Sequence, residues 1–415
     1  MSAIGALIGL FLSICLIIKK IPPTYSLIAG AIVGGLLGGL SLVETVVVMT
    51  DGVKDISSAI IRILTAGVLS GILIKTGAAV TISNAIINKL GEKRVFAALA
   101  VATMLLCAVG VFIDVAVITV APVALSLGKR LNISPSILLL AMIGGGKCGN
   151  IISPNPNTII SAENFGAELS SVMFVNVIPA IVGLLFTIFI IMRIIPKQLQ
   201  KAEYIQSVNE ENKKLPTLWQ SLVAPVVTIL LLALRPIAGV NIDPLIALPI
   251  GGLVGILCMK QWTNILPSIE YGLTKMSSVA ILLIGTGTIA GIIKNSTLKE
   301  WILAGLDKAN ISEVLIAPIS GALMSAATAS TTAGATLASL SFADTILAVG
   351  ISAVWGAAMI NSGATVLDHL PHGSFFHATG GVCELSFKER MKLIPYETLI
   401  GIVLATGTTL ACIIL

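Results

Sequence analysis

All three histidines of the chain lie in one short run, "NSGATVLDHLPHGSFFHATGG", which spans residues 361–381 and also contains Asp368. An imidazole ring takes up and releases a proton near physiological pH, and small changes in its surroundings tune that exchange. The run therefore predicts a proton-coupling group made of Asp368, His369 and His372. His377 lies nearest the following loop, and we expect it to make only an ordinary loop hydrogen bond.

Two further ionisable residues lie within apolar sequence, Asp114 in "GVFIDVAV" and Lys147 in "GGGKCGN". Ionisable side chains inside a membrane span are costly, and they are functional candidates by default. We expect Asp114 to take part in proton coupling. Lys147 is expected to balance the charge of a substrate carboxylate or to pair with Asp114, and the alternative is a purely structural ion pair.

Two segments combine neutral hydrogen-bonding side chains with residues that interrupt a helix. The first, "IGGGKCGNIISPNPNT", contains Pro154 and Pro156, and the second, "NSGATVLDHLPHGS", contains Pro371 between two glycines. Unwound backbone at membrane depth persists only where protein buries it or where it lines a watery cavity. The stretch "SAATASTTAGAT" also contains serine and threonine, which could bind substrate; the alternative is that its small residues only let helices approach closely. The predicted substrate-binding residues are Asn150, Ser153, Asn155, Asn157, Thr158, Ser330, Thr331, Thr332, Asn361, Ser362 and Thr365.

The composition identifies the class of protein that must position these residues. The chain has 415 residues, of which 56% are hydrophobic and only 11% are charged, and its mean hydropathy is +1.02. Apolar segments of about 17–25 residues recur throughout, long enough to cross the hydrocarbon layer as helices and too long for barrel strands. A multi-pass helical membrane protein follows.

Other kinds of chemistry find no support in the sequence. The six cysteines show no CxxC spacing, so we interpret them as packing residues. Cys148 stands where a phosphate-binding loop needs serine or threonine after the lysine, and no HExxH motif accompanies the histidines. We therefore expect no cofactor, no metal and no enzymatic activity. The net charge of +5 is interpreted as a signal of membrane orientation rather than of nucleic acid binding.

Internal matches divide the chain into two halves. "GVLSGIL" matches "GTIAGII", "APVALSL" matches "GATLASL", and the first interrupted segment matches the second, at offsets of 220, 213 and 211 residues. A common order at nearly constant spacing is typical of transporters built from repeats. We predict a first repeat over residues 1–192, a cytoplasmic linker over 193–216 and a second repeat over 217–415.

Positive charge predicts the orientation of these repeats. Lysine and arginine flank both ends of the 34-residue apolar stretch 95–128, which is too short for two full crossings, so both ends should lie in the cytoplasm. This predicts re-entrant hairpins at about 95–128 and 314–340, followed by broken helices at about 136–165 and 345–377. The predicted fold is an all-α polytopic membrane protein with two inverted-topology repeats of about five transmembrane helices each. Both termini would then face outside.

These features together resemble the ion transporter superfamily and, within it, the gluconate:proton symporter (GntP) family. "VFIDVAVITVAPVALSLGKR" at 111–130 is similar to that family's first hairpin, and "ATASTTAGATLAS" at 327–339 is similar to its second. "IGGGKCGNIISPNPNTII" also resembles the broken helix of the superfamily's dicarboxylate branch, where such turns contact substrate or sodium. The chain departs from the gluconate permeases because its first break reads "SPNPNT" and its histidines lie in the second break.

The resemblance implies a secondary active transporter that carries a small organic anion, a gluconate-like hydroxy acid or a related carboxylate, together with protons. It also implies alternating access by movement of a hairpin-bearing unit against a scaffold, a homodimer, and a place in a bacterial inner membrane. The expected partners are the organic anion, a proton or sodium ion, and the lipid bilayer. Sodium-coupled carboxylate transport and cation/proton antiport are the alternatives.

Overall fold

The computed structural model describes residues 1–19, 21–91, 94–194, 215–238, 240, 242–298, 300–301, 304, 312–371 and 373–415. The regular secondary structure of these residues is helical throughout, and they contain no β-strand. The predicted all-helical class is thereby confirmed. Most of the predicted linker 193–216 lies outside the described residues, and so does His372.

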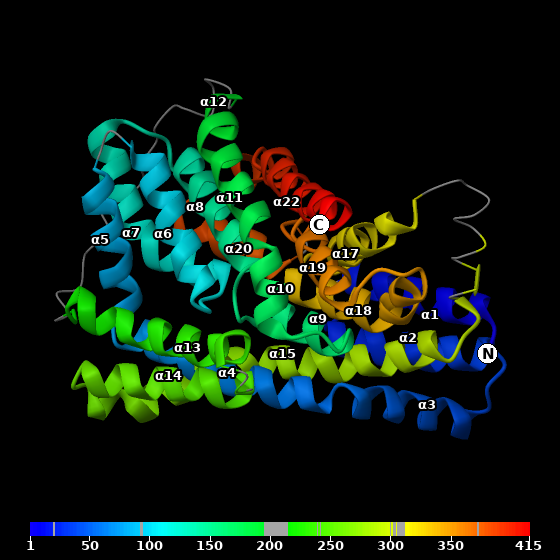
Figure 1. Ribbon diagram of the computed structural model, residues 1–415. Helices are drawn as coiled ribbons and strands as arrows, with labels where there is room; N and C mark the ends of the chain where they lie inside the picture. The colour runs from blue at the N-terminus through cyan, green and yellow to red at the C-terminus, as the bar shows by residue number, and fades with distance from the viewer. Residues whose placement is uncertain are drawn as a thin grey trace.

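The elements of the two halves follow each other in a similar order (Figure 1). The first half contains α1 (Ala3–Ile18), α2 (Pro23–Leu37), α3 (Leu42–Asp55), α4 (Ser57–Lys75), α5 (Ala78–Leu90), α6 (Val95–Ala108), α7 (Ile113–Leu131), α8 (Pro135–Asn150), α9 (Pro156–Asn164), α10 (Leu169–Val175), α11 (Val177–Phe186), the π-helical turn η2 (Thr187–Ile191) and α12 (Met192–Ile194). The second half contains α13 (Leu218–Ala238), α14 (Pro244–Cys258), the short η4 (Trp262–Asn264), α15 (Ile265–Lys294), the short η5 (Glu313–Leu315), α17 (Ile316–Thr328), α18 (Thr331–Ala348), α19 (Ala353–Gly363), α20 (Ser374–Val382), α21 (Phe387–Met391) and α22 (Ile394–Ile414).

Each half begins with two helices and a long helical segment, α3–α4 in the first half and α15 in the second. A pair of helices joined by a tight turn comes later in each half, α6–α7 after α5 in the first half and α17–α18 in the second, and an interrupted helix follows the pair. The interrupted helices begin at Pro135 and Pro156 in the first half and at Ala353 and Ser374 in the second, in both cases 218 residues later.

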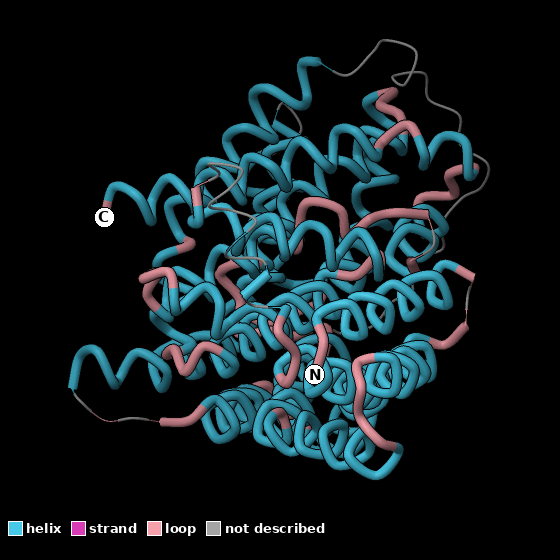
Figure 2. The backbone as a smooth tube through the Cα atoms, turned by 90° about the vertical axis from the view of Figure 1, so that its right-hand side faces the viewer, coloured by secondary structure: helices cyan, strands magenta, loops and turns pink. Residues whose placement is uncertain are grey.

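The helices form two layers (Figure 1). The long helices α3, α4 and α15 lie together along the bottom of the view, with α13 and α14 towards one end and α1 and α2 towards the other. We call α1–α4 and α13–α15 the support layer, and α5–α12 with α17–α22 the hairpin layer. Figure 2 shows the helices at the bottom nearly end-on, with the N-terminus close to them.

Several helices are long and apolar enough to cross a membrane. By length and composition these spans are Ser57–Lys75, Leu169–Ile194, Trp262–Lys294 and Phe387–Ile414, and shorter apolar helices accompany them. Large hydrophobic side chains such as Phe174 and Trp219 are exposed on the outside of the protein. Such exposure is costly in water and favourable in lipid, as a multi-pass membrane protein requires.

Small residues let the long helices of the support layer approach to backbone contact. A Cβ atom added to Gly272 of α15 would lie 2.0 Å from the carbonyl oxygen of Gly67 in α4, and one added to Gly71 would lie 2.0 Å from that of Ser268. Small residues spaced four apart allow such close crossings in membranes, where packing replaces the hydrophobic effect. The α4–α15 contact therefore depends on the absence of side chains.

We expect Gly272→Val to lower the free energy of unfolding by about 1–3 kcal/mol, the usual range for overpacking. The obstacle is the backbone of α4, which cannot rotate away as a side chain could. Thermal unfolding of the purified protein in detergent measures the effect. Gly381→Ala is the matched control, because a Cβ atom at Gly381 would meet no atom within 4 Å. Equal stability of the two variants would contradict the prediction.

Candidate functional site

The turns of the two helix pairs each contact the interrupted helix of their own half. In the first turn Gly110 has φ +102°, and a Cβ atom added to Gly146 of α8 would lie 2.7 Å from Cγ2 of Ile113. In the second turn Ala329 has φ 46°, and a Cβ atom added to Gly373 would lie 2.3 Å from the Ala329 carbonyl oxygen. A non-glycine residue in this region costs energy and persists where the surrounding structure imposes it. The close approach of each turn therefore depends on a glycine of the interrupted segment in the same half, Gly146 in the first and Gly373 in the second.

Local chemistry explains why the first interrupted helix stops and starts again. α8 ends at Asn150, and α9 begins with Pro156 at its first position, where no backbone donor is needed. Asn155 caps α9, since its Oδ1 accepts a hydrogen bond of 3.1 Å from the backbone N–H of Thr158. Its Nδ2 donates to Oδ1 and to the carbonyl oxygen of Asn150, at 2.6 and 2.8 Å. One side chain therefore joins the end of α8 to the start of α9.

Buried amides connect the two halves of the chain. Asn157 Nδ2 donates to Asn361 Oδ1 at 2.9 Å, although the two residues are 204 positions apart. Asn361 Nδ2 donates in turn to Thr158 Oγ1 at 3.0 Å, and Thr332 Oγ1 donates to Asn157 Oδ1 at 3.4 Å. The first interruption, α19 and the start of α18 consequently meet in one hydrogen-bonded group.

A second buried group contains charge. Lys147 is fully buried, and its Nζ lies 2.7 Å from Asp368 Oδ1 and 3.0 Å from His369 Nδ1. The same Nζ donates to the carbonyl oxygen of Thr365, while the other oxygen of Asp368 accepts a 2.6 Å hydrogen bond from Thr331 Oγ1. We call Lys147, Asp368 and His369 the Lys147 cluster. It joins α8 to the second interruption and, through Thr331, to the start of α18.

His369 also fixes the cluster to the last helix. Its Nε2 lies 3.1 Å from the carbonyl oxygen of Ile394 and 3.1 Å from Thr398 Oγ1, both in α22. The described ion-pair partner of Lys147 is Asp368, so the suggested pairing of Lys147 with Asp114 is wrong. His377 makes the loop hydrogen bond that the sequence predicts, because its Nε2 lies 2.8 Å from the carbonyl oxygen of Pro371.

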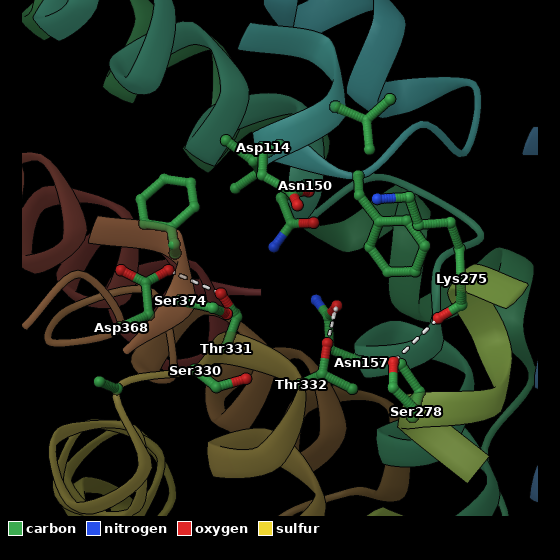
Figure 3. Close-up of a pocket in the computed structure, with 16 residues that line it drawn as sticks. Asp114, Asn150, Asn157, Lys275, Ser278, Ser330, Thr331, Thr332, Asp368 and Ser374 are labelled. Atoms are coloured by element: carbon green, nitrogen blue, oxygen red, sulfur yellow. Dashed lines mark hydrogen bonds between the residues drawn. The ribbon is translucent and has the colours of Figure 1, made fainter. Parts of the chain in front are cut away.

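A cavity of about 260 Å³ opens between these groups, and we call it the central cavity. In Figure 3 the side chains of both turns, both interruptions and α15 surround it, with Asp114 and Asn150 at the top and Ser330, Thr331 and Thr332 below. Its wall consists of Phe112, Ile113, Asp114, Val115, Asn150, Asn157, Lys275, Ser278, Val279, Ala329, Ser330, Thr331, Thr332, Asp368, Ser374 and Phe375. Hydroxyl, amide and charged groups therefore face an open space.

The predicted site residues divide into two sets. The residues that line the central cavity are Asp114, Asn150, Asn157, Ser330, Thr331, Thr332 and Asp368. The residues that are buried behind its wall are Lys147, Ser153, Asn155, Thr158, Asn361, Ser362, Thr365 and His369. The second set holds the wall in place, as Asn155, Asn361 and His369 do through the hydrogen bonds above.

Two polar residues of the cavity, Lys275 and Ser278 of α15, are not among the residues predicted from the sequence. Figure 3 shows both on the side opposite Asp368, where Ser278 Oγ donates to the carbonyl oxygen of Lys275 at 3.1 Å. A signal was present, because Lys275 is an ionisable residue inside the 30-residue helix α15. The rule that singled out Asp114 applies equally to it.

A family profile and several known proteins match this chain. The profile of the family described as GntP family permease matches residues 1–415. A Haemophilus influenzae protein described as an uncharacterized transporter is 54% identical over 409 residues, which make up 99% of this chain and 97% of that protein. A gluconate permease of Bacillus licheniformis is 24% identical, with 69% of this chain and 71% of that protein covered.

The fold itself also occurs in a solved structure. The YdaH transporter of Alcanivorax borkumensis superposes with a TM-score of 0.63 over 99% of this chain and 98% of that one, at 14% sequence identity. At such low identity the likeness concerns the fold alone. The family profile, by contrast, covers every residue, and the chain therefore belongs to the GntP family of permeases and is a multi-pass membrane transporter.

Proposed function

We propose that this protein is a secondary active transporter that carries a small organic anion, a gluconate-like hydroxy acid or a related carboxylate, into the cell together with protons. The observation that carries the proposal is the central cavity, where both helix-pair turns and both interrupted helices meet. The relative named gluconate permease supports the choice of a hydroxy acid. A bacterial inner membrane is the proposed location.

The wall of the central cavity suits a small hydroxylated anion. Ser330, Thr331 and Thr332 offer hydroxyl groups, while Asn150 and Asn157 offer amides that donate and accept hydrogen bonds. Neutral groups of this kind bind an anion without holding it permanently. The volume of about 260 Å³ lies just below the roughly 300 Å³ at which pockets for drug-sized ligands begin, so a small ligand is favoured.

The element order supports the proposed inverted repeats. The second half repeats the first at a distance of 218 residues for both parts of the interrupted helix, and transporters built this way place their substrate where the repeats meet. We propose that α6–α9 and α17–α20 move against the support layer. That movement would expose the central cavity to the two sides of the membrane in turn.

Ionisable residues at the site are proposed to couple proton movement to transport. Asp114 and Asp368 line the central cavity, and His369 contacts Asp368. The fourth predicted member of this group, His372, lies outside the described residues. Carboxylates and imidazoles are the side chains that form proton relays inside membranes.

Uptake into proteoliposomes tests the proposal. We expect labelled D-gluconate to accumulate when the interior is made alkaline in the absence of sodium, and a protonophore should abolish the accumulation. Liposomes without protein are the control. Strict dependence on sodium would replace protons with sodium as the coupling ion. Acidification of the interior of vesicles loaded with sodium or potassium, as the cation leaves and protons enter without any organic substrate, would indicate antiport instead.

A further inference from the structure

Among the residues that the structure describes, we consider four charged side chains in and immediately behind the wall of the central cavity. Asp114, Lys275 and Asp368 line the cavity, and Lys147 lies behind Asp368. For the binding of an anion, what matters is which of these charges have an oppositely charged partner within the protein and which do not. A matched charge contributes little net field, whereas an unmatched one attracts or repels the substrate.

Lys147 and Asp368 neutralise each other. Their Nζ and Oδ1 atoms are 2.7 Å apart, both residues are buried, and Thr331 and His369 complete the contacts of the carboxylate. Removing either charge of such a buried pair is strongly unfavourable. Lys147 is therefore the counterion of Asp368, and the ammonium group available to a substrate carboxylate must come from another residue.

Lys275 is the cavity-lining residue that can offer an ammonium group to a substrate carboxylate. Among the residues that the structure describes, no carboxylate forms an ion pair with it, and its Nζ lies 5.7 Å from the centre of the Tyr271 ring. Lys75 lies over the same ring at 5.0 Å, but it does not line the central cavity. A cation that faces a polar cavity from within a transmembrane helix is a candidate for substrate binding.

Asp114 is the matching unpaired acid. It lies in the first turn of α7, lines the same cavity and forms no ion pair with any described residue. The titratable groups within electrostatic range of Asp114 are Lys275 and Tyr271 on α15 and Cys107 on α6, with Asp368 across the cavity. A thiol and a phenol are ordinarily uncharged near pH 7, so Lys275 and the neutralised Asp368 are the charges that matter.

We propose that Asp114 and Lys275 bind the two coupled ions, a proton on the Asp114 carboxylate and the substrate carboxylate at the Lys275 ammonium. With Asp114 ionised and His369 neutral, the four charges cancel. Protonation of Asp114 leaves one net positive charge, which a monocarboxylate then neutralises. The cavity thus favours the proton and the anion together, in a ratio of one to one. This inference rests on the proposed function and names the residues that perform it.

Lys275 and Asp114 lie in different layers of the protein. Lys275 belongs to the support layer, whereas Asp114 and the hydroxyl groups of Ser330, Thr331 and Thr332 belong to the hairpin layer. Movement of one layer against the other separates the ammonium from the bound carboxylate. Lys275 therefore contacts the substrate in one of the two access states, which allows the anion to leave in the other.

Counterflow and uptake in proteoliposomes test this assignment, with D-gluconate and its neutral amide as probes. We expect Lys275→Gln to raise the KM for D-gluconate at least about tenfold, the loss expected for one charged hydrogen-bond partner, and to leave competition by the amide unchanged. Lys275→Arg should restore most of the affinity because it keeps the charge. Asp114→Asn should retain counterflow but lose accumulation driven by a pH gradient.

Lys75→Gln is the matched control, since this lysine contacts the same tyrosine ring from outside the cavity. Size-exclusion chromatography checks that each variant is folded. For the wild type, we expect one proton to be transported with each gluconate. An unchanged KM in folded Lys275→Gln, or accumulation by Asp114→Asn, would overturn the assignment while leaving the transport function intact. Failure of the wild type to carry D-gluconate or any related carboxylate would remove the proposed function and the assignment with it.

Discussion

Asp368→Asn is expected to lower the free energy of unfolding by about 3–5 kcal/mol and to abolish gluconate accumulation in a pH gradient. The substitution leaves the ammonium of Lys147 fully buried without its carboxylate partner at 2.7 Å. It also adds one net positive charge beside the central cavity, so that anion binding no longer requires a proton. Thermal unfolding in detergent measures the first effect, and uptake measured beside counterflow measures the second.

The double variant Lys147→Gln with Asp368→Asn tests whether the loss of charge balance, rather than the changed side chain of residue 368, causes these effects. It removes both charges, so we expect most of the lost stability to return, and a double-mutant cycle then yields the coupling energy. Recovery of proton-driven accumulation would identify charge balance as the cause of the defect. If accumulation stays lost in the double variant, that explanation is contradicted, and Asp368 itself would be a residue that takes up and releases the coupled proton. Normal stability of the single variant would show that the ion pair is dispensable.

Local chemistry made the interruption of α8 predictable from the sequence. Pro154 and Pro156 cannot continue a helix, and an asparagine before a proline is typical of a helix start, so the sequence predicts a break close to where α8 ends and α9 begins. The two interruptions were also expected to contribute asparagine, serine and threonine to one site. Asn157 and Asn361 are hydrogen-bonded to each other, and their part in substrate binding stays a prediction.

Long-range pairing was not predictable in the same way. Lys147 and Asp368 are 221 positions apart, and the choice of Asp368 over Asp114 depends on how α8 packs against the second interruption. Lys275 shows a similar limit, because its place in the wall of the central cavity depends on how α15 packs against α18 and within the support layer. A single sequence shows which residues are unusual in an apolar helix, but it does not show which of them meet.

The basic run "FKERMK", residues 387–392, contains side chains in two different environments. Clusters of lysine and arginine predict cytoplasmic loops, and that orientation stays a prediction for this run. Lys388 and Lys392 are exposed. Arg390, however, is buried and forms an ion pair with Glu397 in the first turn of α22. Because α21 is a single short helix between two turns, the spacing of the run alone could not distinguish its buried arginine from its exposed lysines.

Glu397→Gln is expected to lower the free energy of unfolding by about 3–5 kcal/mol, as the loss of Asp368 does, because it leaves a buried guanidinium without its carboxylate. Arg390 binds Glu397 through both terminal nitrogens, its Nε donates to the carbonyl oxygen of Phe376 at 3.3 Å, and its guanidinium lies 4.9 Å from the centre of that phenylalanine ring. The pair therefore joins α20, α21 and α22, and thermal unfolding in detergent measures its contribution.

Lys388→Ala is the matched control, because it removes a positive charge from the same short helix at an exposed position, where substitutions usually change stability by less than about 0.5 kcal/mol.

The central cavity supplies a second readout. α20 begins with Ser374, which lines the cavity, so loosening of α20 should also raise the KM for gluconate in those Glu397→Gln molecules that remain folded. A Glu397→Gln protein as stable as Lys388→Ala would mean that Phe376 and the surrounding backbone satisfy Arg390 without a carboxylate. An unchanged KM together with lower stability would confine the role of the pair to holding α22 in place.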